Sequence, residues 1–212
     1  MNKVHIVGNY ADYAKMFISN GWEVVDNVDD ADLVQFCGGS DVSPSMYNAQ
    51  SHVTTEANPK RDTYEAAIFE MAFEQDKAIV GICRGAQFVH VMSGGKLYQD
   101  VGNHAVYGTH HVTIEDDRFK HLAPHGFSVS STHHQMMMEG PGEVILAARL
   151  SNRKETAEGP IVITKEERDL EGVFHKETSS FCYQPHPEFF SPGHLCQKIY
   201  FQLIEELLFN EE

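Results

Sequence analysis

Residues 81–87, with the sequence GICRGAQ, constrain the fold of this chain more than any other segment. They follow an apolar run at residues 78–80 that predicts a buried strand, and they lead into residues 87–92, which favour a helix. A cysteine at such a turn, with a glycine two residues to either side, has the form of a nucleophile elbow that carries a thiol. Larger side chains at the two glycine positions would collide with the neighbouring strand and helix. The thiol of Cys83 would then lie at a helix N-terminus, which favours the thiolate.

Taken alone, this motif has a second interpretation. A free cysteine is often a small buried hydrophobic residue, and the glycines could serve only a tight turn. A second motif a hundred residues later changes the balance between the two interpretations.

That second motif is residues 181–188, FCYQPHPE. Its apolar and aromatic start predicts a strand that ends where Pro185 and Pro187 cannot donate to a sheet. If the backbone stays extended, His186 and Glu188 face the same side, so that the carboxylate can accept from one imidazole nitrogen. The other nitrogen is then free to take a proton from a thiol, which is the logic of a catalytic triad. An exposed, solvated loop is the alternative for this motif alone, but the two motifs together favour the triad.

The two motifs resemble the signatures of the class I, triad-type glutamine amidotransferases, and within them the branch of γ-glutamyl hydrolases. Further similarity lies at residues 38–47 (GGSDVSPSMY), 61–62, 77–80, 94–100 (GGKLYQD) and 133–135 (HHQ), so the resemblance runs from about Gly38 to Phe189. It departs from the family at Cys37, where proline is usual, and at Pro185, where an aromatic residue is usual.

The resemblance implies a role for each matching position. Cys83 would be the nucleophile, His186 the general base and then acid, and Glu188 the residue that orients the histidine. The backbone N–H groups of Gly39 and Arg84 would form the oxyanion hole. The resemblance also implies contacts with the substrate from Gln87, His133, His134 and Gln135.

The order of elements predicts an α/β fold. Apolar runs alternate with helical patterns in the first half, which favours a doubly wound, mostly parallel central sheet flanked by helices. The strands are expected at residues 4–7, 22–25, 33–36 and 78–80, and the helices at 13–19, 62–76 and 87–92. Short strands at 112–114, 127–130, 144–147 and 161–164 predict an antiparallel portion that returns at 180–184, before a last helix at 193–209. The flavodoxin-like fold that the resemblance implies agrees, and residues 1–212 are expected to form a single domain.

Composition limits the partners. The formal net charge is −15, from 31 acidic and 16 basic residues, and such a surface repels nucleic acid and anionic membranes. Four cysteines without paired spacing, and no apolar run long enough for a leader or a membrane span, predict a cytoplasmic protein. A partner with a basic face is compatible with this charge, although the charge could serve solubility alone.

Histidines are dense between residues 104 and 134, at positions 104, 110, 111, 121, 125, 133 and 134. The spacings of common zinc motifs are absent. Adjacent histidines on a strand point to opposite faces, so neither His110-His111 nor His133-His134 could supply two ligands to one ion without a bend. No metal and no cofactor are therefore expected.

The sequence predicts a cysteine amidohydrolase that cleaves a γ-glutamyl amide through a glutamyl thioester. One substrate is glutamine, with ammonia passed to a separate synthetase, since the chain carries no synthetase domain of its own. The alternative substrate is a γ-glutamyl amine or peptide that is simply hydrolysed. A third interpretation, from a different class, is a non-catalytic binding or regulatory domain of the same fold.

Overall fold

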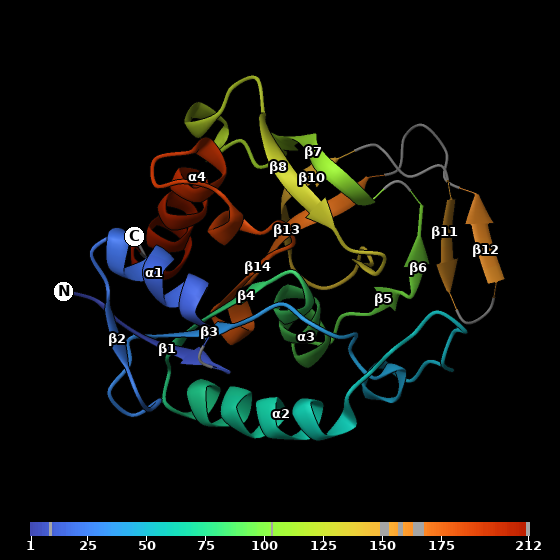
Figure 1. Cartoon of the computed structure of the whole chain (residues 1–212), viewed down its shortest axis with the longest axis horizontal. Coiled ribbons are helices and arrows are strands. Elements are labelled where there is room, and N and C mark those ends of the chain that lie inside the picture. Colours follow the sequence, from blue (N-terminus) through green and yellow to red (C-terminus); the bar gives the residue numbers. More distant parts are fainter. Residues whose placement is uncertain (9, 103, 149–152, 157–158, 163–167, 211–212) are drawn as a thin grey trace.

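The computed structural model describes residues 1–8, 10–102, 104–148, 153–156, 159–162 and 168–210. Its centre is a nine-stranded mixed sheet with the order β2-β1-β3-β4-β14-β13-β10-β7-β8 (Figure 1). The strands from β2 to β14 in this order pair in parallel, and those from β14 to β8 pair antiparallel. The expected doubly wound parallel half and its antiparallel continuation are both confirmed.

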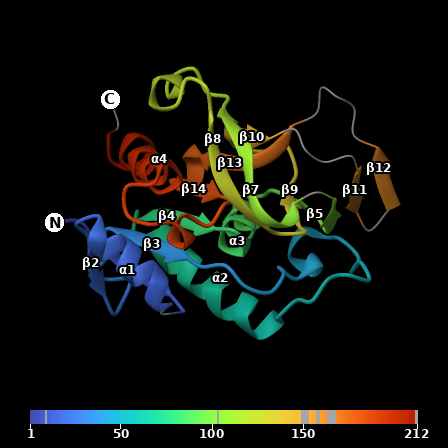
Figure 2. The ribbon, with the colours of Figure 1, turned by 45° about the horizontal axis from the view of Figure 1, so that its top comes forward.

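The strands of this sheet are β1 (Lys3–Val7), β2 (Glu23–Val25), β3 (Leu33–Phe36), β4 (Ala78–Ile82), β7 (Ala105–Ile114), β8 (Phe127–Thr132), β10 (Glu143–Ala148), β13 (Asp169–His175) and β14 (Ser180–Tyr183). Two smaller sheets are formed by β5 (Leu97–Tyr98) with β9 (Met136–Met137), and by β6 (Asp100–Val101) with β11 (Arg153–Thr156) and β12 (Gly159–Val162). The strand expected at 161–164 belongs to the second of these, and residues 163 and 164 lie outside the described residues. The hairpin of β11 and β12 lies far from α1 and α4 (Figures 1 and 2).

The helices are α1 (Ala11–Ser19), α2 (Pro59–Glu74), α3 (Arg84–Met92) and α4 (Leu195–Ile204). Residues Glu205–Phe209 continue α4 as a π-helical turn. Helix α2 begins sharply because the side chain of Asn58 accepts a hydrogen bond from the backbone of Arg61 and Pro59 occupies the first helical position.

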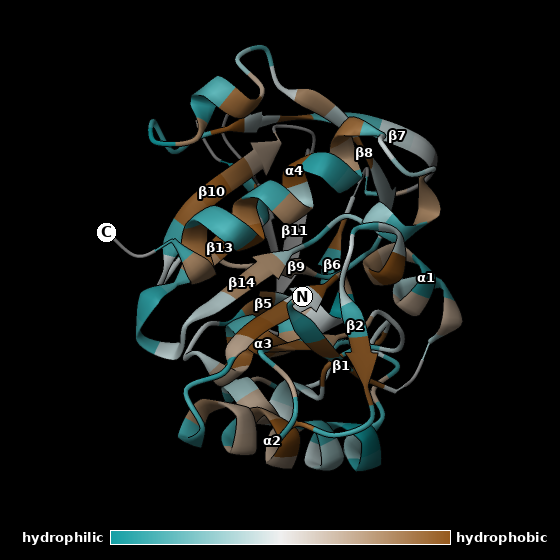
Figure 3. Cartoon of the chain, turned by 90° about the vertical axis from the view of Figure 1, so that its left-hand side faces the viewer, coloured by the Kyte–Doolittle hydropathy of each residue, from teal (hydrophilic) through white to brown (hydrophobic). Residues whose placement is uncertain are grey.

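The helices form layers on both faces of the sheet. One hydrophobic cluster joins α1 and α4 to the sheet, through residues such as Phe17 and Tyr200, and a second joins α2 and α3, through Phe69 and Phe88. Strands β1, β10 and β14 are mostly hydrophobic in Figure 3, as expected for strands between two such layers. The apolar stripe of the last helix packs in the core, where Tyr200, Leu203 and Ile204 are fully buried.

This arrangement brings distant segments together at one edge. Strand β4 lies between β3 and β14, and all three run in parallel. The segments that follow them carry Gly38, Cys83 and His186, so that these residues meet at the carboxyl ends of the strands. Among the described residues, no helix is long and apolar enough to cross a membrane.

Candidate active site

Cys83 lies in the turn between β4 and α3, as the sequence predicts. Its φ of 53° and ψ of −115° fall in a region that side-chain-bearing residues rarely adopt. The flanking glycines are needed for steric reasons: a Cβ atom on Gly81 would overlap the carbonyl of Gly85, and a Cβ atom on Gly85 would overlap the carbonyl of Phe36. The turn therefore requires a strained cysteine between two residues that lack side chains.

The imidazole of His186 lies between Cys83 and Glu188. Its Nδ1 atom is 2.6 Å from Oε1 of Glu188, and its ring lies beside the Cys83 side chain. Burial works to lower the pKa of His186, but the negative charges of the Cys83 sulfur and the Glu188 carboxylate outweigh it and raise the pKa from 6.5 to about 10. The structure therefore brings the three predicted side chains together.

The local geometry differs from the prediction in one respect. Strand β14 ends at Tyr183, and Pro187–Phe189 form a 3-10 turn. The expectation that an extended backbone aligns His186 with Glu188 is wrong, because the turn brings the two side chains together instead. The ring of Phe189 stacks on that of His186, with centroids 4.3 Å apart.

The loop after β3 passes close to Cys83 and His186. A Cβ atom on Gly38 would lie 2.9 Å from the His186 ring and 3.7 Å from the Cβ atom of Cys83, so the backbone approaches both side chains closely. The N–H group of Gly38 donates to the hydroxyl of Tyr13 over 3.0 Å. Gly39 has a φ of +142°, and a Cβ atom there would overlap the guanidinium of Arg61.

A buried ionic network supports this loop from α2. Arg61 donates to Glu65 over 2.7 Å and to the carbonyl of Cys37 over 2.8 Å. Arg84, 1% exposed, forms ion pairs with both Asp62 and Glu65. Burial, together with the nearby charge of Arg61, lowers the pKa of Arg84 to about 10 against the opposing effect of Asp62, so Arg84 stays a cation at neutral pH.

Sequence reasoning missed this network. The segment of Arg61 and Asp62 entered only through its resemblance to a family, and Glu65 was not singled out. A signal was available, since residues 61 and 65 lie one helical turn apart and carry opposite charges.

The residues expected to contact a substrate separate into two groups. Gln87 donates to the carbonyl of Gln135 over 2.9 Å and to the side chain of Gln184 over 3.2 Å, so the structure brings Gln87 and Gln135 together. His134 lies elsewhere, with Nε2 3.2 Å from Oδ1 of Asp41, whose hydrogen bond raises the pKa of this histidine. His133 is buried, and its Nδ1 atom lies 2.8 Å from the carbonyl of Gln135.

An open pocket borders the glycine loop. It is lined by Gly39, Ser40, Asp41, Thr54, Glu56, Asp100 and His134. The carboxylates of Asp41, Glu56 and Asp100 outnumber the single histidine, so the lining favours a cationic group.

The neighbouring histidines of β7 differ in burial, as the alternation of side chains along a strand predicts. His110 is buried while its neighbour His111 is exposed. His104, His110 and His133, which come from separate segments, converge on Glu171 of β13. The sequence analysis did not single out Glu171, because one acidic residue in a strand carries no recognisable spacing to the histidines.

Comparison with known proteins agrees with the fold and the motifs. Residues 16–175 match the Peptidase C26 family. The protein NtpR of Enterococcus hirae is 33% identical over 176 residues, which cover 76% of this chain and 68% of NtpR. The glutamine amidotransferase-like protein YvdE of Lactococcus lactis is 32% identical over 130 residues, which cover 55% of each chain.

Among solved structures, a Thermoplasma acidophilum protein described as one of the subunits of GMP synthase superposes with a TM-score of 0.63 at 16% identity, covering 98% of this chain and 94% of that one. At this level of identity the superposition shows the fold, that of the class I glutamine amidotransferases. Because the family match extends over most of the chain, this protein belongs to the Peptidase C26 family.

Proposed function

We propose that this protein is a cysteine amidohydrolase that cleaves the γ-amide bond of a γ-glutamyl substrate. The observation that carries the proposal is the position of Cys83, on a strained strand-to-helix turn beside His186, whose Nδ1 atom is 2.6 Å from Oε1 of Glu188. A nucleophile, a proton carrier and an orienting carboxylate are the parts that acyl transfer through a covalent intermediate requires.

In the proposed reaction the Cys83 thiolate attacks the γ-carbonyl carbon, and the imidazolium of His186 donates its proton to the leaving nitrogen. The C–N bond breaks, which leaves a glutamyl thioester and frees ammonia or an amine. His186, now neutral, accepts a proton from water, and the hydroxide hydrolyses the thioester to glutamate. Glu188 keeps the ring oriented through both steps.

The backbone N–H groups of Gly39 and Arg84 are proposed to bind the oxyanion. The strained turn and the glycine loop place both segments beside Cys83. One such donor contributes roughly 3 kcal/mol to the stabilisation of a transition state. Gln87, Gln135 and His134 are proposed to contact the substrate. His133 is proposed to hold Gln135 in position through its contact with the backbone carbonyl of that residue.

We favour glutamine as the substrate, with ammonia passed to a synthetase on a separate chain. The names of the relatives support this role, since one is a glutamine amidotransferase-like protein and another is described as part of a synthase. A thiol nucleophile also suits a reducing compartment, which agrees with the cytoplasmic location expected from the sequence.

The pocket beside Gly39 favours a second candidate, the hydrolysis of a γ-glutamyl amine whose leaving group carries a positive charge. Its carboxylates, from Asp41, Glu56 and Asp100, would attract such a group. The two candidates share the chemistry at Cys83 and differ only in the leaving group.

The test is to measure glutamate release from L-glutamine and from γ-glutamyl derivatives of neutral and cationic amines. Cys83→Ala should abolish turnover, whereas Cys196→Ala, which removes a thiol from the core, should retain it. Preference for cationic amines would identify the second candidate. Turnover that survives Cys83→Ala would refute the proposed chemistry, and selective labelling of Cys83 without turnover would indicate dependence on the synthetase partner.

A further inference from the structure

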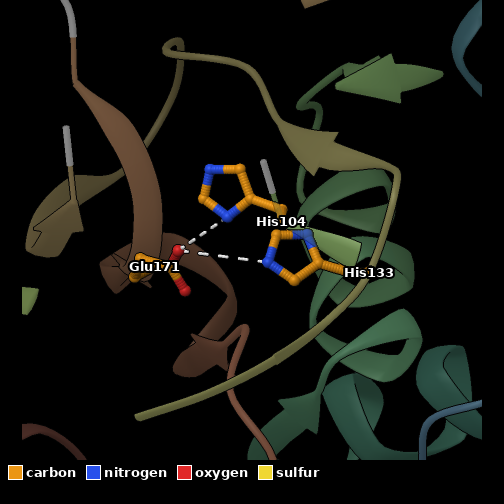
Figure 4. Close-up of side chains that lie close together, drawn as sticks. All are labelled: His104, His133 and Glu171. Carbon is orange, nitrogen blue, oxygen red and sulfur yellow. Dashed lines mark ion pairs between the residues drawn. The ribbon is translucent and has the colours of Figure 1, made fainter. Parts of the chain in front are cut away.

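A cluster of buried ionisable side chains lies beside the candidate active site and takes no part in the proposed reaction. Its centre is the carboxylate of Glu171, which is 0% exposed. The Oε1 atom of Glu171 lies 3.4 Å from Nδ1 of His104 and 4.0 Å from Nε2 of His133. Figure 4 shows the two rings and the carboxylate directed toward one another.

These donors come from three segments that the sheet brings together. His104 precedes β7, His133 follows β8, and Glu171 lies in β13. One ligand atom from each of the three residues can be chosen so that all lie within 4.8 Å of one another. In a tetrahedral zinc site with bonds of about 2.0–2.1 Å, neighbouring donor atoms are roughly 3.3 Å apart, so a small inward shift would close the site.

Several polar atoms at this centre form no hydrogen bond within the described residues. Both oxygens of Glu171, both ring nitrogens of His104 and Nε2 of His133 are buried without hydrogen-bonding geometry to any other described group. An uncompensated buried carboxylate costs several kcal/mol, and buried polar atoms are normally satisfied. The ion pairs that Glu171 forms within the described residues are all with histidines. A cation at the centre would satisfy the carboxylate and one ring nitrogen from each of the two histidines.

A second layer of contacts orients each of the three residues. The Nδ1 atom of His133 lies 2.8 Å from the carbonyl of Gln135, which leaves Nε2 as the free nitrogen. Oδ2 of Asp169 lies 3.3 Å from Nε2 of His104, and Nε2 of His110 lies 3.0 Å from Oε1 of Glu171. Imidazoles that bind metals usually donate their other nitrogen to a carboxylate or a carbonyl. His133 shows this contact with the carbonyl of Gln135, and Nε2 of His104 lies within ion-pair distance of Asp169.

From this geometry we propose that His104, His133 and Glu171 bind one divalent transition-metal ion. Two imidazoles and a carboxylate form the donor set that suits zinc, with a fourth position left open. The ion would hold the segment of residues 133–135 against β13. Because Gln135 contacts Gln87, the ion would stabilise these two proposed substrate-contacting residues without entering the reaction.

The experiment uses the full chain, freed of metal with a chelator and titrated with Zn²⁺ in calorimetry, with the bound metal measured by mass spectrometry. Wild type should bind one equivalent of zinc, and Glu171→Gln and His104→Gln should each weaken binding at least 10-fold. His125→Gln, which changes an exposed histidine of the same region, should bind like wild type. Circular dichroism would show whether each variant is folded.

The Cys83–His186 pair could also attract zinc, so the test must separate the two sites. Cys83→Ser should leave zinc binding unchanged. Cobalt in wild type provides a readout that needs no variant, since ligation by nitrogen and oxygen gives visible bands without a thiolate-to-metal charge-transfer band. Absence of stoichiometric binding to wild type, a thiolate band, or loss of binding in Cys83→Ser would each overturn the proposal.

Discussion

The guanidinium of Arg61 donates a hydrogen bond of 2.8 Å to the carbonyl oxygen of Cys37, and so connects helix α2 to the loop that carries Gly39. The same side chain donates to Glu65, which is paired with Arg84, the residue directly after Cys83. The two backbone segments proposed to bind the oxyanion are thus held by one buried ionic network.

This relationship predicts the effect of Arg61→Lys. Lysine keeps the charge but cannot donate to Glu65 and Cys37 at once through a planar fork. We expect kcat to fall roughly 10- to 100-fold with little change in KM, because a displaced oxyanion donor matters only in the transition state. Steady-state kinetics would check this, with Arg118→Lys, an exposed arginine, as the matched control. An equal rise in KM at constant kcat would contradict the positioning role.

The elbow predicts a strong dependence of stability on Gly85. Gly85→Ala would place a methyl group against the backbone of Phe36, which cannot move away as a flexible side chain could. We expect a loss of about 3 kcal/mol in the free energy of unfolding. Gly140→Ala, where no atom lies within 4 Å of the added Cβ atom, is the control in urea denaturation and should change stability little. Equal stability of the two variants would show that the turn can relax.

The pKa of His186 predicts the alkaline limit of activity. The Glu188 carboxylate is one of the charges that raise this pKa to about 10, so Glu188→Gln should lower it. As the pH rises, the imidazolium that protonates the leaving group would be lost earlier in the variant. The alkaline limb of kcat against pH should therefore shift to lower pH, in addition to a lower maximum. An unshifted limb would mean that Glu188 does not act through the charge on His186.

Thiol reactivity should distinguish Cys83 from the other three cysteines. Cys37, Cys182 and Cys196 are fully buried, and burial raises the pKa of each, to about 12 for Cys196. Cys83 is 8% exposed beside His186. We expect an electrophilic glutamine analogue to label Cys83 alone, as peptide mass spectrometry would reveal. Similar labelling of all four thiols would favour the non-catalytic interpretation of the fold.

The pair of His90 and His175 predicts sensitivity to acid. Nδ1 of His90 lies 3.1 Å from Nε2 of His175, and burial lowers their pKa values to about 3 and about 4, with the charge of His175 contributing to the shift of His90. The unfolded chain binds protons at these histidines below about pH 6.5 while the folded chain does not, so stability should fall as pH drops below 6.5.

At pH 5 the loss should be roughly 2 kcal/mol for each histidine. Urea denaturation at pH 7 and pH 5 would measure it. His175→Asn should reduce the difference between the two pH values, and His121→Asn, which changes an exposed histidine, should leave it as in wild type.

Much of the architecture follows from local patterns. The strand-to-helix elbow at Cys83, the alternation of strands and helices before it and the apolar stripe of the last helix each depend on neighbouring residues, which is why the sequence predicts them. The contact of His186 with Glu188 is also local, although a turn rather than an extended strand produces it. Backbone sterics and side-chain periodicity are sufficient at this range.

The remaining features depend on the pairing of strands far apart in the sequence. The placement of β14 beside β4 brings His186 to Cys83, and the packing of α2 against α3 brings Asp62 and Glu65 to Arg84. The meeting of His104, His133 and Glu171 has the same origin. A single residue such as Glu171 or Glu65 has no periodicity to mark it, so only the tertiary structure could reveal its partners. The sequence was enough to predict the fold class and the candidate reactive groups. Which charges are buried together could be seen only in the folded protein, because burial and pairing are properties of the packed sheet rather than of any segment.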